Sequence, residues 1–207
     1  MVVEKLGYAA YVQVFGRNKL LDSRTYLDAN GNTVNCSDGY AKIVYDNDYK
    51  YNKPEKESYF DADGKPVLLD NGYSVIRYEY LDSRGAILSK SYFGLEDEPV
   101  LLEKEGYHKI DYIYKEGKAS RERYYGTDDK LIDATCGYAI VERSYTTKQQ
   151  IRSEAYYNAQ NKRIICADKG YSKVENRYIG ENLIEAKYFD ENNHPMVSTV
   201  LGYAMVS

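Results

Sequence analysis

Tyrosine is the side chain whose number and spacing in this chain could do chemistry. The 207 residues include 25 tyrosines, four phenylalanines and no tryptophan. A tyrosine ring is apolar in its body and carries a hydroxyl at its tip, so a row of rings can stack on sugar rings and hydrogen-bond their edges. The same rings could instead fill a core, because Leu, Ile, Val and Phe together number only 44 residues.

Many of the tyrosines belong to a Gly-Tyr dipeptide that recurs every 31 to 34 residues. It stands at Gly7-Tyr8, Gly39-Tyr40, Gly72-Tyr73, Gly106-Tyr107, Gly137-Tyr138, Gly170-Tyr171 and Gly202-Tyr203. A fixed period of this size indicates a repeat protein, in which each repeat completes its core by stacking on its neighbours. We therefore expect the dipeptides to be structural and residues 1–207 to form a single β-hairpin repeat domain.

The chain begins and stops in the middle of a repeat. Residues 2–8 resemble residues 100–107 deep inside the array, and the last residues follow directly after a Gly-Tyr dipeptide. We interpret the chain as a segment of a longer polypeptide. Natural caps at the two ends of the array are the alternative.

Each repeat is predicted to hold two antiparallel strands. In residues 74–80 the side chains of Ile76, Tyr78 and Tyr80 share one face with a period of two, which is typical of a half-buried strand. Gly and Asn then supply the backbone freedom of a tight turn. After the returning strand come a second turn and a short apolar piece, which could be a third strand. The expected fold class is all-β, an elongated spiral or solenoid-like array of antiparallel hairpins in six repeats of about 32 residues.

The returning strand of five repeats ends in a pair of aromatic residues. These pairs are Tyr59-Phe60, Tyr92-Phe93, Tyr124-Tyr125, Tyr156-Tyr157 and Tyr188-Phe189. Rings at strand ends are expected to reach solvent more readily than the Gly-Tyr rings or the inward-facing Tyr80, Tyr114, Tyr145 and Tyr178. The ten residues of the pairs are therefore the candidate ligand-binding residues.

Two resemblances follow from these hairpins. The stretch 59–67, YFDADGKPV, resembles the Tyr-Phe-Asp-x-x-Gly-Lys hairpin of bacterial glucan-binding and choline-binding cell-wall repeats. The stretch 78–85, YEYLDSRG, is similar to the Tyr-Asp (YD) repeats of RHS and teneurin-type surface proteins. The first resemblance implies a spiral of hairpins that binds a ligand between aromatic residues, and the second implies a curved sheet that acts as a shell or spacer. This repeat is longer than the wall-binding repeat, and the chain has no tryptophan.

These observations predict a non-catalytic, tyrosine-rich module of a bacterial surface or envelope protein. We expect it to bind a glycan, either a cell-wall or an extracellular polysaccharide, through aromatic grooves between repeats. The alternative is a structural spacer or protein-protein interaction scaffold with no small ligand. Binding requires aromatic clefts that face solvent, whereas a spacer requires only buried rings. The other expected partners are neighbouring domains of the same polypeptide, and the expected location is extracellular or in the cell envelope.

The sequence does not favour an enzyme, and we expect no cofactor. Its two histidines, His108 and His194, lie in different repeats without a nucleophile or metal-ligand spacing, and we expect both to be exposed. The turn at 61–64, DADG, has the oxygen atoms that calcium prefers, but turn formation explains it more simply and we expect no metal. The formal charge of −4 without a basic stripe disfavours nucleic acid.

Neither the apolar runs nor the cysteines indicate a membrane span or a repeated disulfide framework. No apolar run has the length of a membrane span, so we expect no membrane insertion by this segment. Cys36, Cys136 and Cys166 stand at different offsets from the nearest Gly-Tyr dipeptide, so they form no repeated disulfide framework. We expect them to be small buried residues, so they do not indicate whether the protein's compartment is oxidising or reducing.

Overall fold

The structure is a computed structural model that describes residues 6–82, 84–202 and 204–206. Residues 1–5, at the start of the first half-repeat, and Tyr203, of the last Gly-Tyr dipeptide, therefore lie outside the described residues. The described residues form β-strands, turns and one short 3-10 segment, η1 (Arg17–Lys19), without an α-helix. The predicted all-β fold of antiparallel hairpins is confirmed.

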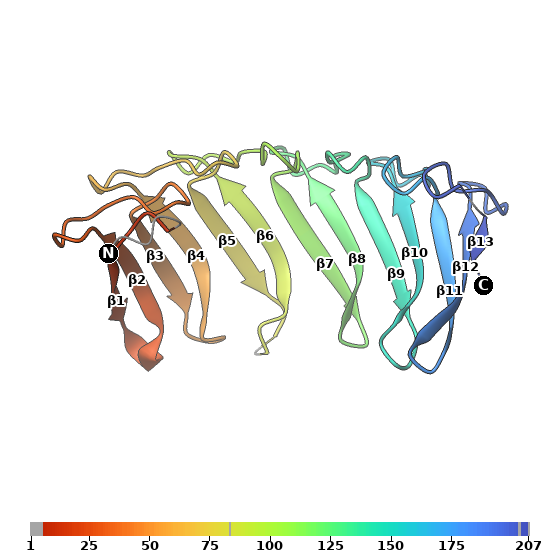
Figure 1. The fold of residues 1–207 in the computed structure, drawn as a ribbon, viewed down its shortest axis with the longest axis horizontal. Coiled ribbons are helices and arrows are strands. Elements are labelled where there is room, and N and C mark those ends of the chain that lie inside the picture. The colour runs from red at the N-terminus through yellow and green to blue at the C-terminus, as the bar shows by residue number, and fades with distance from the viewer. Residues whose placement is uncertain (1–5, 83, 203, 207) are drawn as a thin grey trace. The chain divides into compact units, whose positions relative to one another are not determined.

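The chain divides into two compact units, an N-terminal unit of residues 1–104 and a C-terminal unit of residues 105–207. The N-terminal unit is an open antiparallel sheet of three consecutive hairpins (Figure 1). Its strands are β1 (Ala10–Phe15), β2 (Leu21–Leu27), β3 (Lys42–Asp48), β4 (Lys53–Phe60), β5 (Val75–Tyr80) and β6 (Ile87–Phe93).

The C-terminal unit repeats this arrangement with three more hairpins, and a short last strand pairs with the third of them. Its strands are β7 (Lys109–Lys115), β8 (Lys118–Tyr125), β9 (Ile140–Tyr145), β10 (Ile151–Tyr157), β11 (Lys173–Ile179), β12 (Asn182–Phe189) and β13 (Met205–Val206). Within the described residues, the short apolar piece expected as a third strand forms isolated bridges rather than a strand, for example between Tyr157 and Arg163.

Strand pairing is extensive within a hairpin and brief between hairpins. The two strands of a hairpin pair through six or seven residues, with a register shift near the hairpin turn. Neighbouring hairpins of a unit pair through three residues only, as Ser23–Thr25 of β2 do with Lys42–Val44 of β3. Near their turns, adjacent hairpins must therefore be held by side chains rather than by the backbone ladder.

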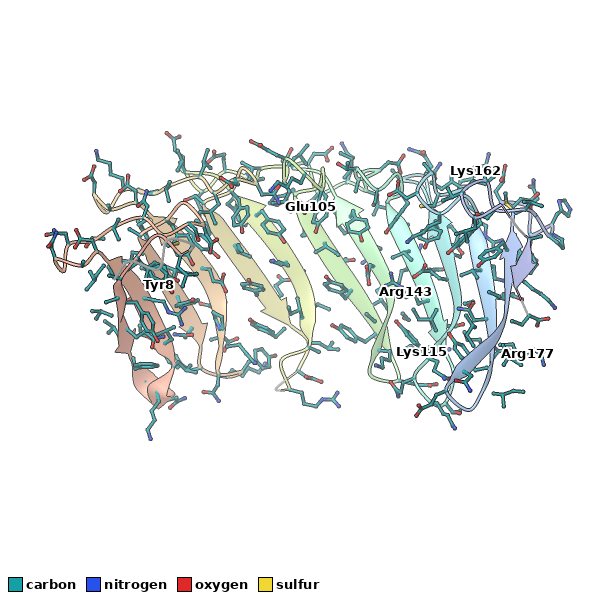
Figure 2. The ribbon with its side chains drawn as sticks, in the orientation of Figure 1. Tyr8, Glu105, Lys115, Arg143, Lys162 and Arg177 are labelled. Carbon is teal, nitrogen blue, oxygen red and sulfur yellow. The ribbon has the colours of Figure 1, made fainter. Side chains whose placement is uncertain are left out.

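A continuous row of tyrosine rings forms the core of each unit. In the N-terminal unit the row is Tyr8, Tyr26, Tyr40, Tyr59, Tyr73 and Tyr92, with neighbouring ring centroids 4.4–5.9 Å apart. In the C-terminal unit it is Tyr107, Tyr124, Tyr138, Tyr156, Tyr171 and Tyr188, with spacings of 4.8–6.1 Å. Rings recur from hairpin to hairpin within each unit (Figure 2). We call each row the tyrosine ladder and the side of the sheet that carries it the ladder face.

Aliphatic side chains complete the core opposite the ladder rings. Each returning-strand tyrosine pairs directly with a residue three positions after a Gly-Tyr dipeptide, for example Tyr59 with Ile43 and Tyr156 with Val141. These aliphatic partners are buried, as expected for the apolar face of each strand. The exception is Tyr11, which lies on the edge strand β1 and is 53% exposed.

Candidate functional site

The two rings of each predicted aromatic pair do not form one site. Consecutive strand residues point to opposite faces of a sheet, so only one ring of each pair can join the ladder. The first rings are buried in the ladder: Tyr59, Tyr92, Tyr124, Tyr156 and Tyr188. The second rings are half-buried on the opposite side, which we call the second face: Phe60, Phe93, Tyr125, Tyr157 and Phe189. The first rings therefore act as core, and solvent-facing aromatic surface must be sought elsewhere.

The Gly-Tyr dipeptides shape the backbone between hairpins and contribute rings to the ladders. The glycine of each dipeptide adopts a positive φ angle: Gly7, Gly39, Gly72, Gly106, Gly137, Gly170 and Gly202. This region of the backbone map favours glycine, and it lets the chain turn into the next strand. The following tyrosines Tyr8, Tyr40, Tyr73, Tyr107, Tyr138 and Tyr171 alternate with the returning-strand rings in the ladders.

A second row of side chains lies beside the ladder, one step closer to the hairpin turns. It consists of directly opposed cross-strand pairs: Gln13 with Arg24, Tyr45 with Glu57, Tyr78 with Lys90, Tyr112 with Glu122, Arg143 with Glu154, and Asn176 with Ala186. Unlike the ladder, this row is polar and varies from hairpin to hairpin. It is the place on the ladder face where the repeats differ most in chemistry.

Arg143 is the centre of the second row in the C-terminal unit (Figure 2). Its Nε donates to Glu154 at 2.6 Å, and its terminal nitrogen donates to Glu122 of the preceding hairpin. Burial disfavours its charge, but the hydrogen bond to Glu154 and the charge of Glu122 outweigh this effect and raise the pKa of the guanidinium. Tyr156 of the ladder also donates its hydroxyl to Glu154. The second row therefore fixes carboxylates directly beneath the ladder.

The last pair of the second row leaves a hollow. Asn176 and Ala186 are the smallest pair, and a groove of about 450 Å³ opens on the ladder face between the hairpins β9–β10 and β11–β12. We call it the ladder-side groove. Its aromatic lining comes from three tyrosines, Tyr171, Tyr178 and Tyr188.

Fixed polar groups border these rings. Glu154 is held by Arg143 and Tyr156, and the Asn176 amide donates to the Ile151 carbonyl at 3.0 Å. Tyr178 donates its hydroxyl to the same carbonyl at 3.1 Å. A groove with aromatic walls and pre-positioned amide and carboxylate groups can accept the apolar face and the hydroxyls of a sugar ring.

A second hollow, of about 500 Å³, lies on the second face of the same unit. Tyr157, Glu142, Arg121, Arg163 and Lys173 contribute to its lining, and we call it the second-face groove. Tyr157 donates its hydroxyl to Glu142 at 2.8 Å. Of the ten predicted aromatic residues, Tyr188 lines the ladder-side groove and Tyr157 lines the second-face groove.

The acidic turns use their carboxylates to hold their own backbone. Asp61 accepts from the amides of Asp63 and Lys65, both at 2.9 Å, as expected for an Asx turn. Hydrogen bonds from the Asn32 backbone, above all, lower the pKa of the equivalent Asp28. In the described part of the chain, no three His, Cys, Asp or Glu side chains gather as metal ligands would.

The prediction that both histidines are exposed is right for His194 and wrong for His108. His108 is 6% exposed, because it follows a Gly-Tyr dipeptide at a position where the other repeats bury Ala41, Ser74 or Ala139.

Cys36 and Cys166 are buried and Cys136 is half-buried, all as free thiols. Among the described residues there is also no helix with the length and hydropathy of a membrane span.

Comparison with known proteins adds no family. No protein-family model matches the sequence, and no curated protein matches it significantly. The residues themselves must therefore carry the functional argument.

The second row and both grooves were not predicted from the sequence. Strand parity places Arg143 and Glu154 on the ladder face, but it does not show that they are directly opposed. An alignment of the repeats would have drawn attention to Ala186, because the position two residues before the first ring of each pair holds a charged residue in the other five repeats: Arg24, Glu57, Lys90, Glu122 and Glu154.

Proposed function

We propose that the chain is a non-catalytic repeat module of a bacterial surface or envelope protein that binds a glycan. The ladder-side groove is the observation that carries this proposal. Its three tyrosines offer ring faces and hydroxyls, and Glu154 and Asn176 offer fixed acceptors and donors at its border. This is the chemistry expected of a shallow site for a neutral sugar ring.

The repeat array itself supports a site of this kind. Tyr171 is packed between the ladder rings Tyr156 and Tyr188, so this part of the groove wall is positioned before a ligand arrives. Pre-positioned walls reduce the entropy lost on binding. Weak binding at one groove would also suffice on a polymer, because linked sites on a repeated ligand raise the overall avidity.

A structural spacer or protein-interaction scaffold is the second candidate, and the burial of the first rings favours it. Tyr59, Tyr92 and Tyr156 are each less than 10% exposed, so most of the ladder is core rather than binding surface. A spacer would need this core and a polar exterior, but no groove. The two functions therefore differ at the ladder-side groove and not in the ladder.

Replacement of Ala186 by glutamate tests the glycan proposal. Glutamate is the residue that Glu57, Glu122 and Glu154 supply at this position in other hairpins, where the neighbouring tyrosine hydroxyl donates to it. The side chain should fill the groove without preventing folding. We expect the wild-type chain to be retained on insoluble cell-wall polysaccharide or peptidoglycan, and the Ala186→Glu variant to bind at least about tenfold more weakly.

Lys187→Ala is the matched control, because it changes the net charge by the same amount at the next residue, on the opposite face. It should be retained as well as the wild type, and thermal unfolding should show that both variants are folded. If the wild type is not retained across a broad panel of wall polysaccharides, or if both variants bind as tightly as it does, the glycan proposal fails and the spacer remains.

A further inference from the structure

The second-face groove has a different chemistry from the ladder-side groove. We propose that it binds the carboxylate of an acidic saccharide, a sugar of the uronic acid class. Three cationic side chains of the second face, Arg121, Arg163 and Lys173, line it together with Glu142 and Tyr157. Arg143 also borders it, but its guanidinium is paired with Glu122 and Glu154. These charges indicate an anionic ligand. The further statement that the ligand is a saccharide rests on the proposed function.

The positive charge of the groove is only partly neutralised. Glu142 accepts from Tyr157 at 2.8 Å and lies 3.3 Å from the Nε of Arg121. Lys173 is paired with Glu175 on its own strand. Of the three cations, Arg163 has the weakest contacts, because its terminal nitrogens make long hydrogen bonds of 3.4 and 3.5 Å to the Asn193 amide oxygen.

The buried part of Arg163 also lacks a partner. Its Nε is shielded from solvent and has no hydrogen-bond partner within the described structure. A buried donor without an acceptor carries a desolvation cost that an anionic ligand close to the guanidinium would offset. Arg163 is therefore the residue on which the proposed site depends most.

The fold does not require a cation at this position. Arg163 forms a single bridge with Tyr157. The residues that form the equivalent bridge in the other repeats are Thr33, Pro66, Pro99, Leu131 and Pro195. Because none of these residues is charged, the positive charge of Arg163 serves something other than the repeat framework.

Small residues keep the groove open. Ala155, opposite Glu142, occupies the position that Arg123 fills in the preceding hairpin and Lys187 in the following one. Beside it, the hydroxyls of Ser144 and Ser153 lie 2.6 Å apart and can hydrogen-bond sugar hydroxyls. The planar guanidinium of Arg163 suits a carboxylate, which it can bind through two parallel hydrogen bonds.

Binding of trigalacturonate to the whole chain tests this site, with a neutral trisaccharide and inorganic phosphate as separate probes. Isothermal titration calorimetry should detect trigalacturonate binding that weakens as salt is raised. Arg163→Gln should weaken it at least about tenfold, because a hydrogen-bonded charge pair is lost. Lys162→Gln, an exposed neighbour with the same change of charge (Figure 2), should leave it unchanged.

Each other outcome contradicts the proposal. It fails if trigalacturonate does not bind, if the two glutamine variants weaken binding equally, or if phosphate or the neutral sugar binds as well as the uronate. Ala186→Glu separates the two grooves, because it should weaken retention on neutral glycan and leave trigalacturonate binding intact. Loss of trigalacturonate binding in that variant would place the uronate in the ladder-side groove and overturn the assignment.

Discussion

At the scale of single residues, the same position in successive repeats can be under different constraints. The glycine of each described Gly-Tyr dipeptide has a positive φ, but the space around it varies. A Cβ atom at Gly170 would lie 2.5 Å from the Val200 backbone nitrogen, whereas a Cβ at Gly39 would have nothing within 4 Å. The positive φ explains why glycine recurs at this position. The close backbone contact explains why a side chain should be tolerated less well at Gly170 than at Gly39.

Replacement of Gly39 and Gly170 by alanine should separate the cost of the positive φ from the cost of the close contact. Gly39→Ala should lower the free energy of unfolding by about 1–2 kcal/mol, the cost of placing a side chain in the left-handed region. Gly170→Ala should cost a further amount of about 1–3 kcal/mol, because its methyl group meets fixed backbone. Urea denaturation of the two variants checks this, and equal losses would show that the close contact at Gly170 is relieved without cost.

At the scale of the elements, tyrosine hydroxyls join adjacent hairpins where the strand pairing between them has ended. The hydroxyl of Tyr80 donates to the carbonyl of Pro54 at 2.7 Å, and that of Tyr145 donates to the carbonyl of Ala119 at 2.9 Å. Both acceptors belong to the preceding hairpin. These bonds hold the hairpins side by side near their turns. The backbone pairing between neighbouring hairpins covers three residues and does not extend that far.

Removal of one such hydroxyl should loosen the contact between hairpins. Tyr145→Phe keeps the ring but leaves the Ala119 carbonyl without its donor, so we expect the free energy of unfolding to fall by about 0.5–1.5 kcal/mol. Hydrogen exchange should also become faster in the hairpin turns of β7–β8 and β9–β10. Tyr49→Phe, at a ring that is 41% exposed, is the control and should change neither. An equal effect of the two substitutions would count against the hydroxyl bond.

The hairpins were predictable from the sequence, whereas the grooves were not. Ile76, Tyr78 and Tyr80 reveal the strand because its period of two is local, and the turns follow from Gly and Asn. A groove depends on a cross-strand pair, such as Asn176 with Ala186, and therefore on a register that spans ten residues and a bulge. Sequence reasoning also grouped the two residues of each aromatic pair by proximity along the chain, although a strand sends them to opposite faces.

At the scale of the whole molecule, positions that the repeats share build the core, and positions that depart from the repeat mark the candidate sites. The tyrosine ladder recurs in both units, while Ala186 opens the ladder-side groove and Arg163 charges the second-face groove. A core made of tyrosine has a further consequence. Its hydroxyls are weak acids, so the core can be ionised in a way that an aliphatic core cannot.

Burial raises the pKa values of these tyrosines, and this links stability to high pH. Burial raises the pKa of Tyr112, Tyr125 and Tyr171 to about 12, and it raises those of the ladder rings Tyr59 and Tyr156 further. In the unfolded chain a tyrosine ionises near pH 10, so this contribution to stability is complete below about pH 10. It is lost as the pH rises through the folded-state values, because the unfolded chain then releases protons that the folded chain retains.

An alkaline titration that follows tyrosinate absorbance and far-ultraviolet circular dichroism on one sample tests whether the tyrosine ladder is the core. We predict two classes of tyrosine among the 25. Solvent-exposed tyrosines should ionise near pH 10 with the β-sheet signal unchanged. Buried ladder rings such as Tyr59 and Tyr156, whose pKa values burial raises, should ionise at higher pH, together with the loss of that signal. Ionisation of all the tyrosines near pH 10 with the sheet intact would show that the rings face solvent, and it would contradict the buried ladder.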